Sequence, residues 1–451
     1  MVSEWREYRI SEIADIVGGS TPSTSDPSNF NGDIPWMTPK DLSGPHDRYV
    51  SRGERNLSRK GLESCSAQLL PRGTVLVTSR APIGYAAIAK NPITTNQGFR
   101  NLVPKPGVDS EFLYYWVKAN VEELRRHASG STFQELTGTA LAQIRIRVPP
   151  LPEQHAIAHI LGTLDDKIEL NRRMSETLEA MARALFKAWF VDFEPVRAKM
   201  EGRWERGQSL PGLPAHLYDL FPDRLVESEL GEIPEGWRVA RLGDFVVTIK
   251  GRSYKSEELV EGSDVALVTL KSFARGGGYR PDGLKPFAGC YKQEQVVKPG
   301  EVVVACTDVT QAAEVIGRAA MVRRSNLYRD LVASLDTLIV RPKTSDMTVA
   351  FLYSLLRTDA FVEHTYAHVT GTTVLHLAKD AVPSFTFALP PEMLVHIFDG
   401  IAGIIFSKVE TLELENDTLA ALRDAFLPKL IRGEIRVKEV EQLVLQHVSN
   451  T

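Results

Sequence analysis

Residues 149–171 read PPLPEQHAIAHILGTLDDKIELN, and residues 390–412 read PPEMLVHIFDGIAGIIFSKVETL. Each stretch opens with a pair of prolines, and proline suits the first turn of a helix because its missing N–H is not needed there. Apolar residues then recur at spacings of three and four, as they do on one face of a helix. The two stretches begin 241 positions apart, so the chain contains the same helix entrance twice.

Both helices are expected to be long. A helix from Glu153 to Phe190 would extend roughly 57 Å at about 1.5 Å per residue, and each helix carries an apolar stripe suited to a second helix. Asn171 and Asn416 interrupt the two stripes, either as polar residues that fix the register of a pair or as simple surface positions. We predict a spacer made of two antiparallel, coiled-coil-like helices related by a pseudo-twofold.

The segments around the helices are also duplicated. EWREYRISEIADIV and EGWRVARLGDFVVTI align Trp5 with Trp237, and residues 130–150 correspond to residues 371–391 at the same offset of 241. A repeat of this length indicates two copies of one architecture. We predict the following order: a first domain at 1–150, a first long helix at 151–195, an acidic linker at 196–235, a second domain at 236–389, a second long helix at 390–435 and a tail at 436–451.

The two globular segments read as mixed α/β. Apolar runs at 74–78 and 302–305 predict buried strands. Segments 111–118 and 350–357 predict short helices. The predicted fold class is therefore α/β, with two duplicated domains joined by the helix pair.

Composition places limits on the class of protein. The 451 residues exceed one ordinary core, and a hydrophobic share of 43% with 24% charged residues is typical of a globular protein. We expect no membrane span and no export signal, since the opening MVSEWREYRI is charged. Cys65, Cys290 and Cys306 lack zinc-site spacing, and so few cysteines suit a reducing cytoplasm.

Charge is unevenly distributed along the chain. Segments 1–150 and 236–389 each carry a net charge of +3, whereas 201–235 carries −5 and 390–451 carries −4. Loops rich in Gly, Ser, Thr and basic residues lie within the two positive segments. Such loops suit contact with phosphates and base edges, although each loop alone could be an ordinary solvated turn.

Catalytic motifs are missing from the sequence. It contains no HExxH, no GxSxG and no P-loop, and its ten histidines are scattered. We therefore expect no catalytic residues and no metal site in this chain.

Several stretches carry a family resemblance. The run GSTF…LAQIRIRVPPLPEQHAIAHILGTLDDKIELNRRM, the second-half opening GEIPEGWRVARLGDF and the closing LRDAFLPKLIRGEI resemble the specificity subunit of type I restriction–modification enzymes. The resemblance covers nearly the whole chain in the family's order of recognition domain, helix, recognition domain and helix. One departure is PPEMLVH at the second helix entrance, where the first copy has PPLPEQH.

The resemblance implies a non-catalytic subunit of a DNA adenine methyltransferase and endonuclease. Its two target-recognition domains would read a bipartite, asymmetric DNA target, one half-site each. The helices would hold the domains apart and dock two methyltransferase subunits, and restriction/translocase subunits would complete the complex. S-adenosylmethionine, ATP and Mg would then be bound by the partner subunits, with no cofactor in this chain.

Two sets of residues follow as predicted sites. The predicted DNA contacts, which lie in or beside Gly/Ser/Thr-rich loops, are Ser20, Thr21, Lys40, Thr78, Ser79, Arg80, Ser131, Thr132, Lys250, Arg252, Lys255, Lys271, Arg275, Arg280 and Thr372. The predicted helix-pair and docking residues are Ile157, Leu161, Leu164, Ile168, Leu178, Leu185, Ile397, Ile401, Ile405, Val409, Leu412 and Leu419.

Two alternatives remain open from the sequence. The duplicated domains could form a protein-binding scaffold that does not touch DNA, which the weak overall charge would suit. A specificity subunit could also serve a methyltransferase alone, because a nuclease would be encoded elsewhere. Salt-dependent binding to duplex DNA would separate the scaffold from a DNA-binding protein.

Overall fold

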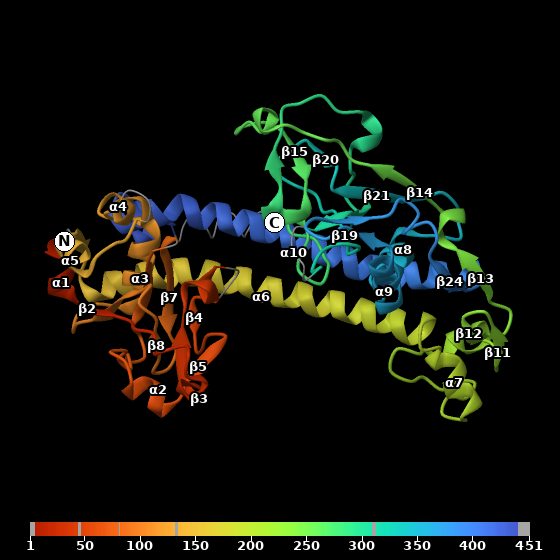
Figure 1. The fold of residues 1–451 in the computed structure, drawn as a ribbon, viewed down its shortest axis with the longest axis horizontal. Helices are drawn as coiled ribbons and strands as arrows, with labels where there is room; N and C mark the ends of the chain where they lie inside the picture. Colours follow the sequence, from red (N-terminus) through yellow and green to blue (C-terminus); the bar gives the residue numbers. More distant parts are fainter. Residues whose placement is uncertain (1–4, 44–46, 81, 131–133, 309–312, 441–451) are drawn as a thin grey trace. The chain divides into compact units, whose positions relative to one another are not determined.

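A computed structural model describes residues 5–43, 47–80, 82–130, 134–308 and 313–440. The chain forms two compact units. Unit 1 comprises Met1–Leu170 with Thr418–Thr451, and unit 2 comprises Asn171–Asp417. The boundaries fall inside the two long helices, α6 (Leu151–Phe190) and α10 (Glu392–Arg432), so each unit contains one α/β domain and a segment of both helices (Figure 1).

Unit 1 contains two main sheets and a two-stranded ribbon. One sheet has the order β2-β9-β6-β7-β4, the other has the order β5-β3-β8 with β3 and β8 parallel, and β1 pairs with β10. The strands are β1 (Arg6–Arg9), β2 (Ala14–Gly18), β3 (Phe30–Met37), β4 (Tyr49–Val50), β5 (Arg55–Leu57), β6 (Val75–Ser79), β7 (Ile83–Ala89), β8 (Thr94–Thr95), β9 (Arg100–Pro104) and β10 (Arg145–Val148). The short helices are α1 (Ile10–Ile13), α2 (Arg59–Glu63), α3 (Ser110–Ala119), α4 (Val121–Arg126) and α5 (Gly138–Gln143).

Local sequence explains these elements. All five residues of β6 are buried, which is why it reads as a continuous run rather than an alternation. Helix α3 begins where the Asp109 carboxylate accepts the N–H of Phe112, and this cap satisfies one of the free donors at the helix start. The α3 residues from Phe112 to Val117 are buried, and α3 packs against β7.

Unit 2 repeats this topology. A sheet β14-β21-β17-β19 corresponds to the larger sheet, β16-β15-β20 with parallel β15 and β20 corresponds to the smaller one, and β13 pairs with β24. The strands are β11 (Leu225–Ser228), β12 (Gly231–Pro234), β13 (Arg238–Arg241), β14 (Val246–Lys250), β15 (Val265–Val268), β16 (Lys285–Pro286), β17 (Val302–Ala305), β18 (Thr307–Asp308), β19 (Ala319–Met321), β20 (Asp330–Ala333), β21 (Thr337–Pro342), β22 (Val369–Thr370), β23 (Leu375–Leu377) and β24 (Thr386–Leu389). The helices are α7 (Glu194–Met200), α8 (Val349–Leu355) and α9 (Asp359–Ala367).

The long helices run antiparallel within each unit. In unit 1, Asp165 of α6 accepts a hydrogen bond from Arg423 of α10 at 2.8 Å, and Ile157 shares a core with Ile431. In unit 2, the Asn171 amide donates to Asn416 Oδ1 at 3.1 Å and to Glu415 at 2.9 Å. Asn171 is fully buried, so the register-fixing interpretation of these asparagines agrees with their contacts. The predicted pseudo-twofold stays a prediction.

None of the predicted helix-pair residues is fully exposed. Five are buried, namely Ile157, Leu161, Leu164, Val409 and Leu412. The others are half-buried, namely Ile168, Leu178, Leu185, Ile397, Ile401, Ile405 and Leu419.

The segment predicted as an acidic linker is folded. Helix α6 stops at Phe190, and Phe193 adopts a left-handed backbone with φ 53° before α7 begins. Trp204, Leu217 and Phe221 are then buried in the same core as Trp189. The acidic residues of this segment therefore lie on the outside of a packed structure.

No helix in the described part of the chain is long and apolar enough to cross a membrane.

Candidate nucleic-acid interface

In unit 1, the carboxyl ends of four strands meet. Strands β2, β3, β6 and β8 lead into loops that main-chain hydrogen bonds hold together, and we call this arrangement junction 1. The bonds are Ser20 N–H to Thr95 O at 2.9 Å, Asn96 N–H to Met37 O at 2.9 Å and Ser79 N–H to Gly98 O at 2.8 Å.

Unit 2 contains the same arrangement at the ends of β14, β15, β17 and β20, which we call junction 2. The corresponding bonds are Arg252 N–H to Ala333 O at 2.8 Å, Ser334 N–H to Val268 O at 3.0 Å and Cys306 N–H to Asp336 O at 2.7 Å. The two junctions therefore share one backbone framework, on which different side chains are mounted.

One glycine in each junction allows the loops to approach closely. A Cβ added to Gly19 would lie 2.1 Å from the Asn96 carbonyl oxygen, and one added to Gly251 would lie 2.1 Å from that of Ser334. Because a backbone carbonyl cannot move aside cheaply, any other residue would force the loops apart. The tight approach holds the following residue, Ser20 or Arg252, against the neighbouring strand end.

A one-turn helix carries a lysine in each junction. These helices are η2 (Pro39–Leu42) and η6 (Leu270–Ser272), and each follows a capping threonine. Lys40 and Lys271 occupy the same position in the two turns, and both are exposed. Sequence reasoning chose both lysines separately as DNA contacts, and the structure places them as equivalents.

Each junction also presents an exposed residue at the tip of a β-turn. The Phe99 N–H donates to Asn96 O at 3.3 Å, and the Thr337 N–H donates to Ser334 O at 2.9 Å. These bonds close turns whose second residues are Gln97 and Leu335, both exposed. Sequence reasoning missed the pair, because the turns share no residue type that marks them.

Two of the predicted DNA contacts in unit 1 are buried. Thr78 and Ser79 are inaccessible, and the Thr78 hydroxyl donates to Pro82 O at 2.7 Å while it accepts the Tyr85 N–H at 2.9 Å. The structure therefore does not present either side chain to a ligand, and the DNA contact of these two residues stays a prediction.

The remaining predicted contacts of unit 1 lie at or near junction 1. Ser20, Thr21 and Arg80 are partly exposed, and the Thr21 hydroxyl donates to the side-chain oxygen of Gln97. Lys40 forms an exposed ion pair with Glu54 at 2.9 Å. Two further predicted residues, Ser131 and Thr132, lie outside the described residues.

In unit 2, Arg252 is committed to an internal contact. Its guanidinium pairs with Glu258 and lies 5.4 Å from the centre of the Phe287 ring. The main-chain N–H of Lys255, followed by Arg252, holds the pKa of Glu258 below its usual range. Arg252 therefore stabilises the conformation of its loop, and its charge is partly neutralised by Glu258.

The other predicted residues of unit 2 are exposed. Lys250 ends β14 and Lys271 lies in η6, so both belong to junction 2. Arg275 pairs with Glu314 at 3.2 Å and Arg280 pairs with Asp282, which partly neutralises their charge. The exposed residues of this set are Lys250, Lys255, Lys271, Arg275, Arg280 and Thr372.

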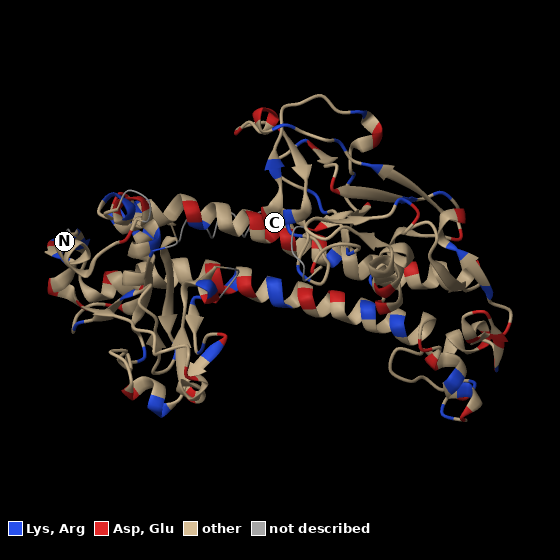
Figure 2. Cartoon of the chain, in the orientation of Figure 1, with Lys and Arg blue, Asp and Glu red and all other residues tan. Residues whose placement is uncertain are grey.

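Basic and acidic residues are interleaved rather than segregated. Blue and red segments alternate along α6 in Figure 2. In the sequence of this helix, Lys167, Arg172 and Arg173 lie among acidic residues. Any DNA contact must therefore come from local groups of basic side chains, such as those of the junctions, and not from a uniformly positive face.

Each domain is attached to its helix segments through a buried arginine. In unit 1, Arg48 donates to the Tyr115 hydroxyl at 2.9 Å and to Asp166 of α6 at 3.0 Å. In unit 2, Arg323 contacts Glu179 of α6 at 3.2 Å and Glu413 of α10 at 3.5 Å. We call these groups the unit 1 clamp and the unit 2 clamp.

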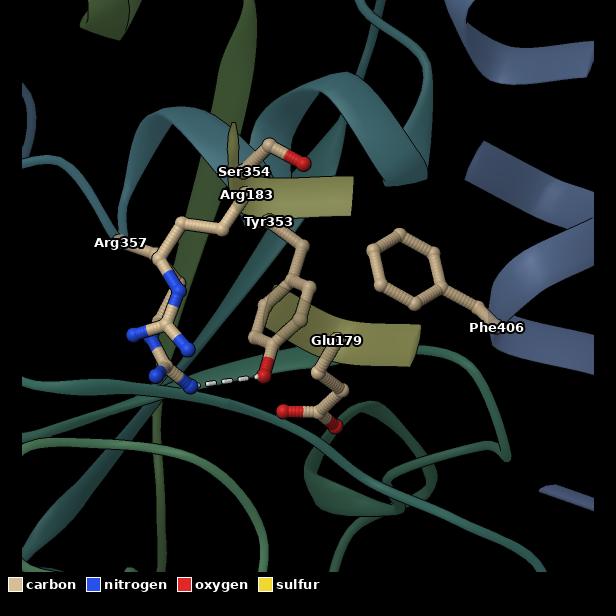
Figure 3. A pocket seen from close by; sticks show the side chains of 6 residues that line it. All are labelled: Glu179, Arg183, Tyr353, Ser354, Arg357 and Phe406. Carbon is tan, nitrogen blue, oxygen red and sulfur yellow. Dashed lines mark hydrogen bonds between the residues drawn. The ribbon is translucent and has the colours of Figure 1, made fainter. Parts of the chain in front are cut away.

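A small pocket lies beside the unit 2 clamp (Figure 3). It is lined by Glu179 of α6, Tyr353 of α8 and Phe406 of α10, together with Arg357 in the turn after α8. Arg357 donates to the Tyr353 hydroxyl at 3.0 Å. Its volume of about 10 Å³ has room for no more than about one water molecule. It is a packing gap between helices and domain rather than a ligand site.

Among the described residues, no group of three or more His, Cys, Asp or Glu side chains is placed to hold a metal ion.

Comparisons with known proteins agree with the architecture. A family model described as the type I restriction modification DNA specificity domain matches residues 2–180. The chain is 35% identical over 449 residues to the type I restriction enzyme MjaIX specificity subunit of Methanocaldococcus jannaschii, covering 97% of this chain and 95% of the relative. It is 25% identical over 366 residues to the HindI specificity subunit of Haemophilus influenzae, covering 72% of this chain and 77% of the relative.

A solved structure shows the same fold. The type I restriction-modification S subunit from M. genitalium superimposes with a TM-score of 0.54 at 16% sequence identity, over 95% of this chain and 96% of that chain.

Proposed function

Since the chain belongs to the family of type I restriction enzyme specificity subunits, the non-catalytic DNA-recognition subunits of these enzymes, we propose that each α/β domain reads one half of a bipartite, asymmetric DNA target. Junction 1 would contact one half-site and junction 2 the other. Membership of this family also argues against a scaffold that does not touch DNA.

The observation that carries the proposal is the match between the junctions. Their main-chain hydrogen bonds coincide, whereas the side chains at equivalent positions differ. Ser20 in junction 1 corresponds to Arg252 in junction 2, Gln97 corresponds to Leu335, and Gly98 corresponds to Asp336. Two domains that recognise different DNA half-sites require the same backbone with different side chains. Side chains recognise the bases, and the backbone positions these side chains.

We further propose that the long helices bind two methyltransferase subunits. Several apolar side chains on them point away from the cores, including Leu170 and Met181 of α6, each 56% exposed, and Ile404 of α10, 75% exposed. Exposed apolar groups of this kind suit a protein partner. The methyltransferases would bring S-adenosylmethionine, restriction/translocase subunits would bring ATP and Mg, and the complex would act in the cytoplasm.

The proposal is tested by sequencing modified bases in a host that carries this chain and its methyltransferase. The expected target has two specified parts separated by an unspecified gap. A contiguous target, or the absence of any sequence-specific modification, would overturn the proposal. In the same preparation, native mass spectrometry should show two methyltransferase copies per chain, and a chain that remains alone would overturn the docking proposal.

Salt dependence separates this proposal from the scaffold alternative. Binding of the complex to duplex DNA should weaken steeply as salt rises, because phosphate contacts release counterions. Affinity that does not change with salt would favour a protein-binding scaffold.

A further inference from the structure

The two β-turns at the junctions present equivalent residues of opposite chemistry. Gln97 and Leu335 are the second residues of matched turns, and each turn is held on both sides by matched main-chain bonds. Leu335 has 41% of its surface exposed, and its N–H donates to Arg252 O at 2.7 Å. Both side chains are therefore presented by a backbone that is already fixed, which favours selective recognition.

The Gln97 amide is oriented by a neighbour. Its oxygen accepts the Thr21 hydroxyl and retains a second lone pair. Among the described residues, its nitrogen makes no hydrogen bond. An amide with one donor edge and one acceptor edge matches adenine in the major groove, which offers N7 as an acceptor and the N6 amino group as a donor.

Leu335 can make no such contact. At the equivalent position it offers only methyl groups, and the apolar feature of the major groove is the C5-methyl group of thymine. The same place in the two junctions is thus suited to opposite members of an A·T pair.

On the basis of the proposed function, we propose that Gln97 and Leu335 are specificity-determining residues. Gln97 reads an adenine in the half-site of junction 1, and Leu335 contacts a thymine methyl group in the half-site of junction 2. Ser334 and Asn96, which begin the two turns, position these residues without reading a base.

Single-group changes in DNA test each contact. The purified complex of the chain with its methyltransferase is bound to target duplexes in which each adenine in turn is replaced by 7-deazaadenine, or each thymine by uracil. One 7-deazaadenine removes one of the two hydrogen bonds, so it should weaken the wild-type complex by about 5-fold, the low end of the range for a bidentate contact, and should leave Gln97→Leu unaffected. One uracil should weaken the wild type at least severalfold and leave Leu335→Ala unaffected.

Matched controls come from the opposite ends of the equivalent strands. Gln68 is exposed and precedes Leu70, whose backbone pairs with Ile93 at the amino end of β8. Leu327 is 79% exposed and precedes β20. Gln68→Leu and Leu327→Ala make the same substitutions away from the junctions, and both should respond to the substituted DNA like the wild type.

The outcomes separate this inference from the function on which it rests. Loss of sensitivity at one position in one half-site, seen only in the junction variants, supports it. A wild-type complex that binds its bipartite target but gives junction variants with unchanged sensitivity overturns the inference and leaves the proposed function standing. A wild-type complex with no sequence preference overturns the proposed function itself. If Gln97→Leu impairs assembly, Gln97→Glu provides the second measurement, since it keeps the length, loses the donor, and must likewise lose sensitivity to 7-deazaadenine.

Discussion

The two helix entrances share their prolines but are anchored by different chemistry. At the start of α6, the buried Gln154 accepts the Asp109 N–H at 2.8 Å and donates to Pro149 O at 2.8 Å and Gly107 O at 3.1 Å. At the same offset in α10, Val395 is fully buried in an apolar core. One entrance is thus held by directional hydrogen bonds and the other by packing, although the path of the chain is the same.

The clamps differ in the same way. Arg48 contacts a tyrosine hydroxyl and Asp166. The Asp166 side chain is 70% exposed, so its carboxylate is still hydrated. Arg323 is only 5% exposed and faces Glu179 and Glu413, which are 24% and 29% exposed. Duplication has therefore preserved the topology, while the interactions that attach each domain to its helices have changed. Four expected effects test this difference, from the largest to the smallest.

Arg323→Ala should cost about 3–5 kcal/mol in the free energy of unfolding, because it leaves two carboxylates partly buried without their cation. Arg48→Ala should cost less, about 1–3 kcal/mol, since Asp166 is exposed. Denaturant unfolding of the full chain measures both. The exposed neighbour Arg324 supplies the control, for Arg324→Ala should lie within about 0.5 kcal/mol of the wild type. Equal costs for Arg323 and Arg48 would show that the clamps do not differ.

Gln154→Ala should destabilise the protein by about 2–3 kcal/mol. It removes a side chain that makes three hydrogen bonds, and it leaves the buried Pro149 carbonyl and the part-buried Asp109 N–H without this partner. Val395→Ala removes a similar volume from the other entrance, and its cost should come from the cavity alone, about 1–2 kcal/mol. Thermal unfolding with hydrogen exchange at the Asp109 amide distinguishes the two, because only Gln154→Ala should expose that amide. Continued protection there would contradict the assigned role.

Glu413→Gln should alter how stability depends on pH. Burial raises the pKa of Glu413 from 4.5 to about 7, Arg323 opposes this rise, and Glu179, Asp417 and Glu410 add to it. Because the folded pKa lies above the unfolded value, the stability tied to protonated Glu413 is complete below about pH 4.5 and is lost as pH rises through about 7. The variant cannot ionise, so its stability relative to the wild type should improve by about 1–2 kcal/mol between pH 5 and pH 8.

Unfolding curves at several pH values provide the measurement for this carboxyl. Glu176→Gln serves as the control, because Glu176 is exposed on α6 and forms an i,i+4 pair with Arg172. A pH profile for Glu413→Gln that runs parallel to that of the wild type would contradict a raised pKa.

Much of the fold could be predicted from the sequence. Paired prolines and apolar periodicity predicted α6 and α10, since both signals arise from the geometry of a single helix. The end of α6 could not be predicted, because the left-handed Phe193 that follows it has no local signature. The segment 196–235 was interpreted through its charge, whereas the burial of Trp204 and Phe221 determines its structure. Net charge describes a surface, and it did not reveal the core beneath.

The candidate site was less predictable. Lys40 and Lys271 could be chosen because lysines beside turns are recognisable, but their equivalence depends on main-chain bonds between segments far apart in sequence. Thr78 and Ser79 look like surface hydroxyls in the sequence, yet a buried hydroxyl can satisfy nearby main-chain groups, as that of Thr78 does. Gln97 and Leu335 share no sequence signal, and their equivalence follows only from the matched main-chain hydrogen bonds of the two junctions.

The smallest expected effect concerns these two lysines. Each is proposed to contact a phosphate, so Lys40→Ala and Lys271→Ala should weaken binding to all sequences alike, by roughly threefold each, and lower the salt slope by about one.

The effects of the two lysine substitutions should not be equal. Lys40 pairs with Glu54, whereas Lys271 forms no ion pair within the described residues, so Lys271→Ala should cost slightly more. The Lys40–Glu54 pair is exposed on both sides, so the difference is at most about 1 kcal/mol. Glu54→Gln would remove the negative charge of this pair and should strengthen binding in the wild type but not in Lys40→Ala. Fluorescence anisotropy across a salt series measures the wild type, the three single variants and the Glu54→Gln/Lys40→Ala double variant. A gain from Glu54→Gln that persists without Lys40 would mean that Glu54 simply repels the DNA.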